Sequence, residues 1–185
     1  MQENDAKTDK RILVLSLITK LREQLELTQQ LLVLLPPDQL AWRPVDNAFR
    51  VGELLGHLLD CLAGFCAALY AVRPDELKHF QSLRLHQVNH FCSIEEAQQR
   101  LAEYQSFIEE GFAALDDKDL AKRLPTLFAS EGETVLSVLL NNLEHFINHK
   151  YQLFFYLKLL GVEVATPNLY YFRGASEAVS QSETP

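Results

Sequence analysis

Four long segments of the chain carry the hydrophobic periodicity of α-helices, and no segment shows the strict alternation typical of a half-buried strand. The pattern predicts helices over residues 8–35, 51–72 and 93–115, and a fourth that starts within 130–134 and ends at 160. Four helices of this length indicate an all-α fold, a four-helix bundle of up-and-down type. The connections after the first and second helices are longer than bundles usually have, which is typical of functional rims or of short extra helices.

Capping signals support these boundaries. The first helix ends at Pro36-Pro37, because proline cannot continue a helix. The third and fourth helices each open on an S-x-x-E capping box, at Ser93 and at Ser130. Gly161 is a natural C-terminal cap for the fourth helix.

The composition is that of one globular domain. The 185 residues are 48% hydrophobic and 23% charged, which is enough to build a single core. We expect residues 1–174 to form the bundle domain and residues 175–185 to be a flexible C-terminal tail, since that end is rich in small and polar residues.

Several classes of function are disfavoured by charge and cysteine usage. A net charge of -8 without clustered Lys and Arg argues against nucleic-acid binding. The apolar stretch 54–72 carries His57 and Asp60, so a buried bundle helix is favoured over a membrane span. We expect no signal peptide. Three cysteines without a CxxC pair indicate neither a disulfide framework nor a thiolate zinc site, and they suit a reducing cytoplasm.

The fourth helix is apolar around most of its circumference, so its polar residues are informative. At about 100° per residue, five of them share one stripe of roughly 80°. They are Asn142, His145, His149, Gln152 and Tyr156. Within this stripe, His145 and His149 have the four-residue spacing by which helical HxxxH pairs chelate one metal ion.

The second helix offers a third ligand. His57 lies on a Leu-rich segment, with Glu53 one turn before it, Cys61 one turn after it and Asp60 nearby. Burying unpaired polar groups costs on the order of 1 to 3 kcal/mol each, so several inward polar groups indicate a shared purpose. We therefore predict a divalent-metal site at His57, His145 and His149. Glu53 and Asp60 are candidates for a general base or for a partner that orients an imidazole.

Other interpretations of these residues stay open. The stripe could face solvent or a dimer partner, with Phe146, Phe154 and Phe155 forming the core, and Cys61 could be a small core residue. A second HxxxH pair, His86 and His90, lies with His79 in the long connection after the second helix. Its helical patterning is weaker, so we interpret it as rim or surface.

The motifs together resemble the DinB/YfiT-like superfamily. The resemblance covers residues 8–173 and is carried by LPPDQLAWRP, VGELLGHLLD, EHFINHKYQL and LKLLGV, in that order. It implies a four-helix bundle in which His57, His145 and His149 hold nickel or zinc. The chain departs from the family pattern on both sides of His149. Relatives often have a basic residue, a glycine and a glutamine where Lys150, Tyr151 and Gln152 stand, and many have a histidine in place of Asn148.

Three neutral imidazoles would leave a metal with its full charge and with open positions, as catalytic sites do. The resemblance implies enzymes that use low-molecular-weight thiols as well as hydrolases. We favour a metal-dependent S-transferase acting on a thiol and a small-molecule substrate. The alternatives are a metal-dependent hydrolase of small esters or amides and a non-catalytic, stress-associated metal-binding protein. HxxxH lacks the internal Glu of HExxH, so a zinc-peptidase mechanism is disfavoured. The aromatic faces of the fourth helix are compatible with a homodimer.

Overall fold

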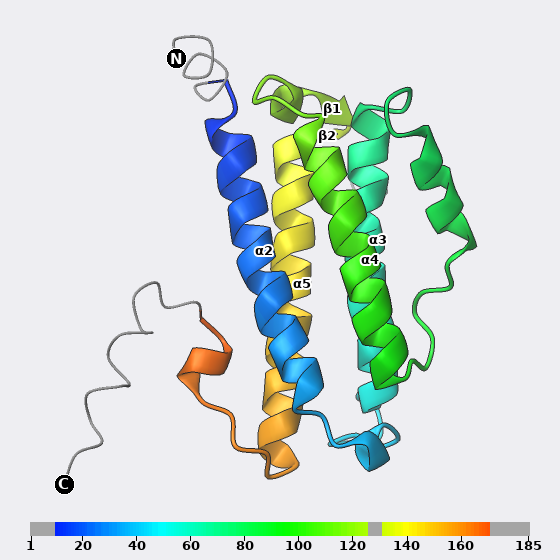
Figure 1. Ribbon diagram of the computed structural model, residues 1–185, viewed down its shortest axis with the longest axis vertical. Coiled ribbons are helices and arrows are strands. Elements are labelled where there is room, and N and C mark those ends of the chain that lie inside the picture. The colour runs from blue at the N-terminus through cyan, green and yellow to red at the C-terminus, as the bar shows by residue number, and fades with distance from the viewer. Residues whose placement is uncertain (1–9, 126–130, 171–185) are drawn as a thin grey trace, which may run out of the picture.

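Four long helices pack side by side in the computed structural model, which describes residues 10–125 and 131–170 (Figure 1). They are α2 (Ile12–Val33), α3 (Val51–Val72), α4 (Ile94–Ala113) and α5 (Val135–Leu159). The short elements between and after them are η1 (Pro37–Gln39), η2 (Lys78–Leu85), η3 (Asp119–Ala121), β1 (Arg123–Leu124), β2 (Glu133–Thr134) and η4 (Thr166–Asn168). The predicted all-helical class is confirmed. The predicted 175–185 tail lies outside the described residues.

Helix α3 is the most buried of the four, with 14 buried residues against nine in α2, seven in α4 and eight in α5, and it packs against both α4 and α5. Among the described residues it is the one helix long and apolar enough to cross a membrane, and 61% of its most apolar window is buried inside the bundle. Leu54, Leu62 and Leu69, on one face of the helix, are fully buried. The packing of α3 between its neighbours thus accounts for its apolar composition.

The direction of the helices differs from the predicted alternation. The backbone N–H of Cys92 donates to the Gly52 carbonyl at 2.9 Å, so α4 begins at the same end of the bundle as α3 and runs parallel to it. The prediction of up-and-down topology is therefore wrong for this pair. The connection 73–93 with η2 returns along the whole bundle before α4 starts, whereas a short loop would have forced the two helices antiparallel (Figure 1).

Two glycines of α3 let this connection lie directly on the helix. A Cβ on Gly56 would lie 1.9 Å from the carbonyl oxygen of His90, and one on Gly52 would lie 2.8 Å from the Phe91 ring. The Gly56 carbonyl in turn accepts the backbone N–H of Asn89 at 3.1 Å. The glycine spacing in VGELLG therefore fixes where the residues before α4 sit relative to α3.

The fourth helix, α5, starts at the later end of the predicted range 130–134. Its N-cap is Thr134, whose hydroxyl accepts the Ser137 N–H at 3.2 Å, while Ser130 lies outside the described residues. The residues before the helix form β2, which pairs antiparallel with β1. Two-residue strands are too short to show an alternation in the sequence. The predicted cap of α4 is confirmed, because Ser93 Oγ accepts the Glu96 N–H at 3.1 Å.

A buried carboxylate, that of Asp119, links the end of α3 to the segment before β1. Asp119 is fully buried and forms ion pairs with Arg73 at 2.6 Å and Lys122 at 2.8 Å. Burial alone would raise the pKa of the Asp119 carboxyl. The ion pairs with Lys122 and Arg73 and the N–H of Asp116 outweigh burial and lower the pKa to about 2. The end of α3 is thereby fixed to the segment that leads into the hairpin.

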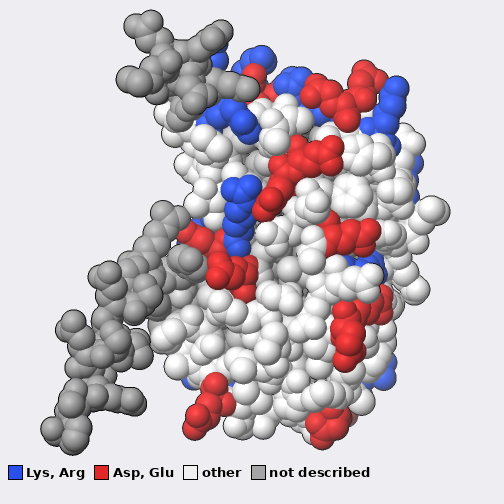
Figure 2. Space-filling view, in the orientation of Figure 1, with Lys and Arg blue, Asp and Glu red and all other residues white. Residues whose placement is uncertain are grey.

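The structure contains no disulfide among its three cysteines, and the charges on the face shown are mixed in sign, as the sequence indicated. Cys61, Cys66 and Cys92 are free thiols and are buried. Burial is the main cause that raises the pKa of each to about 12. On the face of the molecule in Figure 2, acidic and basic side chains are interspersed and large areas carry neither.

Candidate metal centre

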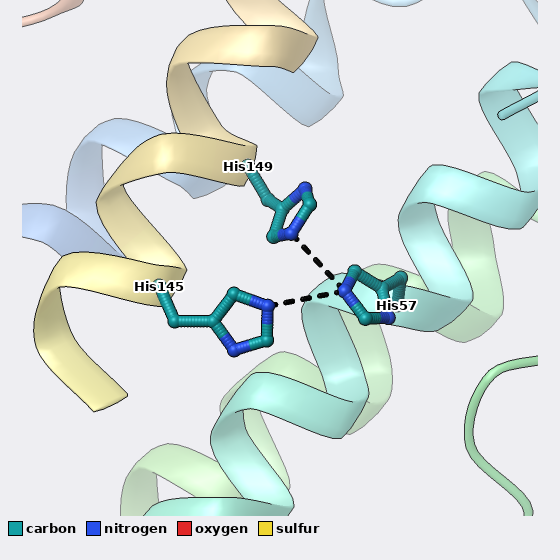
Figure 3. A group of neighbouring side chains, drawn as sticks. All are labelled: His57, His145 and His149. Carbon is teal, nitrogen blue, oxygen red and sulfur yellow. Dashed lines mark hydrogen bonds between the residues drawn. The ribbon is translucent and has the colours of Figure 1, made fainter. Parts of the chain in front are cut away.

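Three imidazoles converge between α3 and α5, at mid-height of the bundle. His57 projects from α3, and His145 and His149 project from successive turns of α5 (Figure 3). The Nε2 atom of His57 lies 3.2 Å from Nε2 of His145 and 3.1 Å from Nε2 of His149. All three ligand atoms lie within 4.8 Å of one another. The structure thus brings together the three histidines that the sequence singled out.

The spacing of these nitrogens fits one transition-metal ion. Imidazole nitrogens bind such ions at about 2.0 to 2.1 Å, so two nitrogens on one ion lie roughly 3 Å apart. The separations of 3.1 and 3.2 Å match that value. Three lone pairs turned on one point repel each other unless a cation lies between them. The donor set therefore fits a divalent metal held by three neutral imidazoles.

Asn89 fixes the His57 ring on the side away from the other two histidines. Nδ1–H of His57 donates to Asn89 Oδ1 at 2.5 Å, which leaves Nε2 with its lone pair facing the other two histidines. Asn89 has a φ of 54°, in the left-handed region that asparagine tolerates better than most residues. The backbone N–H of Asn89 donates to the Gly56 carbonyl. The close approach at Gly56 therefore positions the residue that orients the first candidate ligand.

A chain of hydrogen bonds holds the third imidazole. Nδ1–H of His149 donates to Gln152 Oε1 at 2.9 Å, and Gln152 Nε2 donates to the Tyr156 hydroxyl at 2.9 Å. That hydroxyl donates to the Phe49 carbonyl at 3.1 Å. From His149 to Tyr156, the polar stripe of α5 thus faces α3 and its lead-in. Partners of this kind commonly fix the tautomer and raise the basicity of a ligating histidine.

An aromatic side chain covers one side of the cluster. Phe49, just before α3, stacks on His57 with ring centroids 5.1 Å apart, and it lies edge-to-face with His149 with centroids 6.1 Å apart. Phe49 is 39% exposed and lies between solvent and the imidazoles on that side. His145 is exposed, which leaves the cluster open on another side. A small molecule could therefore approach the three nitrogens past His145.

The electrostatics favour neutral rings. Burial is the main cause that lowers the pKa of His149; the hydrogen bond to Gln152 opposes it, and the nearby His57 and His145 add to it. Burial also lowers the pKa of His145, and His57 adds to this effect, while Asp60 opposes it. Both rings are therefore neutral at neutral pH, as metal coordination requires.

The two candidate carboxylates occupy different places. Glu53 caps α3: its carboxylate accepts the Arg50 N–H at 2.8 Å and pairs with the Arg50 guanidinium. Arg50 is the main cause that lowers the pKa of Glu53. This N-terminal role explains its position without a part in chemistry. Asp60 is half-buried and lies within electrostatic reach of His145 and Cys61.

Cys61 touches the cluster but remains a thiol. Its Sγ lies 3.7 Å from Nδ1 of His145, and burial, with Asp60 adding to it, raises the thiol pKa to about 12. Such a pKa agrees with a small core residue and not with a thiolate nucleophile.

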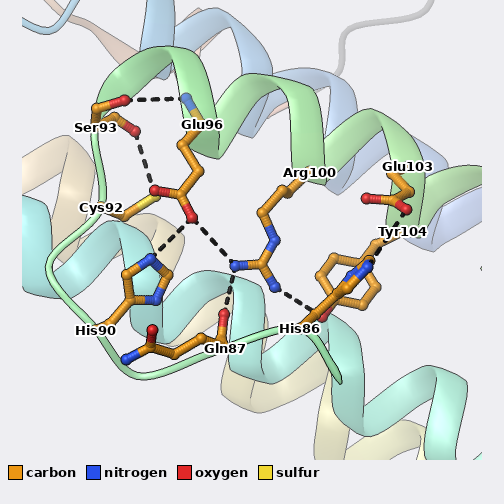
Figure 4. A network of polar contacts seen from close by, with 9 residues as sticks. All are labelled: His86, Gln87, His90, Cys92, Ser93, Glu96, Arg100, Glu103 and Tyr104. Carbon is orange, nitrogen blue, oxygen red and sulfur yellow. Dashed lines mark hydrogen bonds and ion pairs between the residues drawn. The ribbon is translucent and has the colours of Figure 1, made fainter. Parts of the chain in front are cut away.

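The second HxxxH pair does not converge. His86 and His90 follow η2 in an irregular segment, where a spacing of four residues does not place side chains together. Nε2 of His90 pairs with Glu96 at 2.8 Å, and His86 lies 3.8 Å from Glu103 (Figure 4). Cys92 lies beside His90 and Glu96. Arg100, 3.3 Å from the Glu96 carboxylate, already supplies a positive charge there. His79 pairs with Glu110 at 3.0 Å.

A sequence model of the DinB superfamily matches residues 20–153, most of the chain. The chain belongs to the DinB superfamily. Its fold is similar to the crystal structure of a DinB-like protein from Bacillus subtilis, with a TM-score of 0.63 at 15% identity over 80% of this chain and 94% of that one. A comparison with curated protein sequences gives no match.

The departures from the family pattern fall around the third histidine. Lys150 is buried, and its Nζ donates to Gln24 Oε1 at 2.7 Å and to the Leu169 carbonyl at 2.8 Å. Burial, which dominates, lowers the pKa of this amine to about 8. Tyr151 and Asn148 are exposed, whereas Gln152 supports His149. In this DinB-like protein the basic residue therefore joins α5 to α2 and to the segment after α5.

Sequence reasoning missed Asn89 and Phe49. Both lie in irregular segments: Asn89 is 32 residues after His57, and Phe49 is just before α3. The one signal that could have indicated Asn89 is the Gly52–Gly56 pair, since two glycines a turn apart mark a close approach of another segment. Nothing in the sequence says which residue makes that approach.

Proposed function

We propose that this DinB-like protein is a metal-dependent enzyme in which His57, His145 and His149 hold one nickel or zinc ion. The observation that carries the proposal is the meeting of three Nε2 atoms at ligand spacing, two of them with Nδ1–H groups already engaged. On the half-buried His57 and His149, an Nε2 atom without a partner would cost free energy, which a shared metal ion would offset. Imidazole suits both metals, and availability in the cell often decides between them.

We propose thiol transfer to an electrophilic small molecule as the reaction. The bound cation would supply Lewis-acid chemistry, stabilising the anionic form of a thiol or of water. In the transfer, the sulfur–carbon bond forms, the bond to the leaving group breaks and the leaving group keeps its electron pair. The thiol proton passes to solvent, and Asp60, whose charge acts on His145, is the carboxylate that would relay it. A low-molecular-weight thiol is the cosubstrate in this scheme.

The surroundings of the histidines support transfer over amide hydrolysis. Amide cleavage needs a group that protonates the leaving amine. Among the described residues, no carboxylate hydrogen-bonds to the three imidazoles, and Glu53 is engaged by Arg50. A thiol ionises far more readily than water, so its transfer needs less help from the protein. Hydrolysis of activated esters is the second candidate, favoured by Asp60 beside the exposed His145.

The chain's own residues divide the remaining tasks. Asn89 and Gln152 orient two of the rings, and Phe49 keeps water from one side of the cluster. The substrate would approach past His145. We place this activity in the cytoplasm, in keeping with three free cysteines. No partner other than small molecules is required, and a homodimer remains a proposal that the exposed Tyr151 and Phe155 of α5 support.

Two measurements test the reaction. Protein loaded with Co²⁺ is titrated with cysteine and with glutathione, and a thiolate-to-metal absorption band is expected in wild type but not in His145→Ala. Loss of 1-chloro-2,4-dinitrobenzene is then followed with and without thiol, beside hydrolysis of p-nitrophenyl acetate. Ester turnover without thiol would favour the hydrolase, and failure of every assay despite tight metal binding would favour a non-catalytic metal-binding protein.

A further inference from the structure

A pocket of about 540 Å³ lies between α3 and the connection that follows it. One wall is a face of α3 and the other is η2 with the residues after it; we call it the α3–η2 pocket. Its apolar lining includes Ala63, Ala67, Ala71, Phe80, Leu83 and Val88. None of the three clustered histidines lines it. Its volume is within the range of small-molecule sites, roughly 300 to 1,000 Å³.

The pocket results from small side chains opposite large ones. Ala63, Ala67 and Ala71 follow one another at four-residue spacing on α3, so this strip of the helix carries nothing longer than a methyl group. Phe80 and Leu83 are buried and anchor η2 at the side of the strip. The backbone of η2 is therefore held over a strip that does not fill the space beneath it.

The polar groups of the lining carry one sign of charge. Arg84 is the one formally charged residue that lines the pocket, and no carboxylate lines it. No ion pair of Arg84 is found among the residues that the structure describes. The lining also includes His86, whose Nδ1 is buried without a hydrogen-bond partner. Gln81 and Tyr70 are already paired, the amide donating to the hydroxyl at 2.6 Å. The exposed Arg84 guanidinium is therefore the group beside the apolar wall that can meet an anion.

We propose that the α3–η2 pocket binds a free amphiphilic carboxylate, such as a medium-chain fatty acid. The apolar chain lies along Ala63, Ala67 and Ala71, and the carboxylate meets the Arg84 guanidinium. A guanidinium binds carboxylates in a fork geometry that a neutral headgroup cannot use. The net charge of -8 opposes docking on an anionic membrane, so the ligand is the free acid. The site is separate from the metal centre and does not depend on it.

Calorimetric titration of the full, metal-free chain with decanoate and with decanol tests the proposal. Decanoate is expected to bind at one equivalent and at least tenfold more tightly than decanol. Ala67→Trp fills the pocket and should abolish binding, whereas Ala113→Trp, at an exposed alanine of α4, should not. Arg84→Gln should weaken decanoate at least tenfold and leave decanol unchanged. Arg22→Gln, which removes one charge at a distant exposed ion pair, is its control.

Thermal unfolding of each variant tests whether the fold is kept. Because Arg84 is exposed, Arg84→Gln is expected to fold, so it tests the proposal even if Ala67→Trp does not fold. The proposal is overturned if decanoate does not bind, if decanol binds as tightly, or if Ala67→Trp folds and binds decanoate like wild type. Binding to vesicles of phosphatidylglycerol without binding of decanoate would also overturn it.

Discussion

Replacing Asn89 by glycine removes the acceptor that orients His57. Glycine adopts a φ of 54° without strain, so the backbone conformation is kept. The lost hydrogen bond alone is worth about 0.5 to 1.5 kcal/mol. The freed ring must then also be ordered on metal binding, and removal of such partners typically costs 10- to 100-fold in metal affinity. We therefore expect Asn89→Gly to weaken zinc binding by about ten- to hundredfold, or roughly 1.4 to 2.7 kcal/mol.

Competition with a chromophoric chelator measures this loss. Asn89→Asp keeps an acceptor at the same place, so its zinc affinity is expected to stay at or above that of wild type. Asn141→Ala, at an exposed position of α5, is the control for loss of an asparagine. If Asn89→Gly folds and binds zinc within twofold of wild type, the orientation of His57 by Asn89 has no energetic role and the reasoning is refuted.

Three further predictions concern the scaffold. Gly56→Ala would place a Cβ 1.9 Å from the His90 carbonyl, so we expect a loss of about 1 to 3 kcal/mol in urea unfolding together with weaker zinc binding. Thr134→Ala removes the N-cap of α5 and should cost about 1 kcal/mol by the same measurement. Because the folded-state pKa of Asp119 is lowered to about 2, its contribution, on the order of 2 kcal/mol, is present above its ordinary pKa near 4 and is lost as pH falls toward 2. Urea unfolding from pH 5 to pH 2 should show this loss, and Asp119→Asn should show less of it.

Each of these has a result that would count against it. Gly56→Ala with wild-type zinc affinity would mean that the connection can move without disturbing the histidines. Unchanged stability of Thr134→Ala would show that β2 alone fixes the start of α5. Equal acid sensitivity of Asp119→Asn and wild type would assign the acid loss to other carboxylates.

The long helices and the three histidines could be predicted because both depend on local periodicity. His145 and His149 share a face in any helix, and a polar residue such as His57 on a Leu-rich helix has few other uses. The parallel course of α3 and α4 was missed, because the length of the connection 73–93 fits a loop at one end as well as a full crossing. Asn89 was missed for the same reason, since its place depends on that crossing. Glu53 has the sequence spacing of a partner to His57, yet Arg50 and the helix N-terminus explain it.

The central claim is that three histidines from α3 and α5 hold one metal ion. Elemental analysis of the protein purified without a polyhistidine tag tests it most directly. The same analysis is made of a double variant that combines His145→Ala with His149→Ala. The control is His79→Ala, whose ring pairs with Glu110 outside the cluster. We predict about one equivalent of nickel or zinc in wild type and in the control, and none in the double variant. Wild-type protein that contains no metal and takes up neither added nickel nor added zinc would contradict the account.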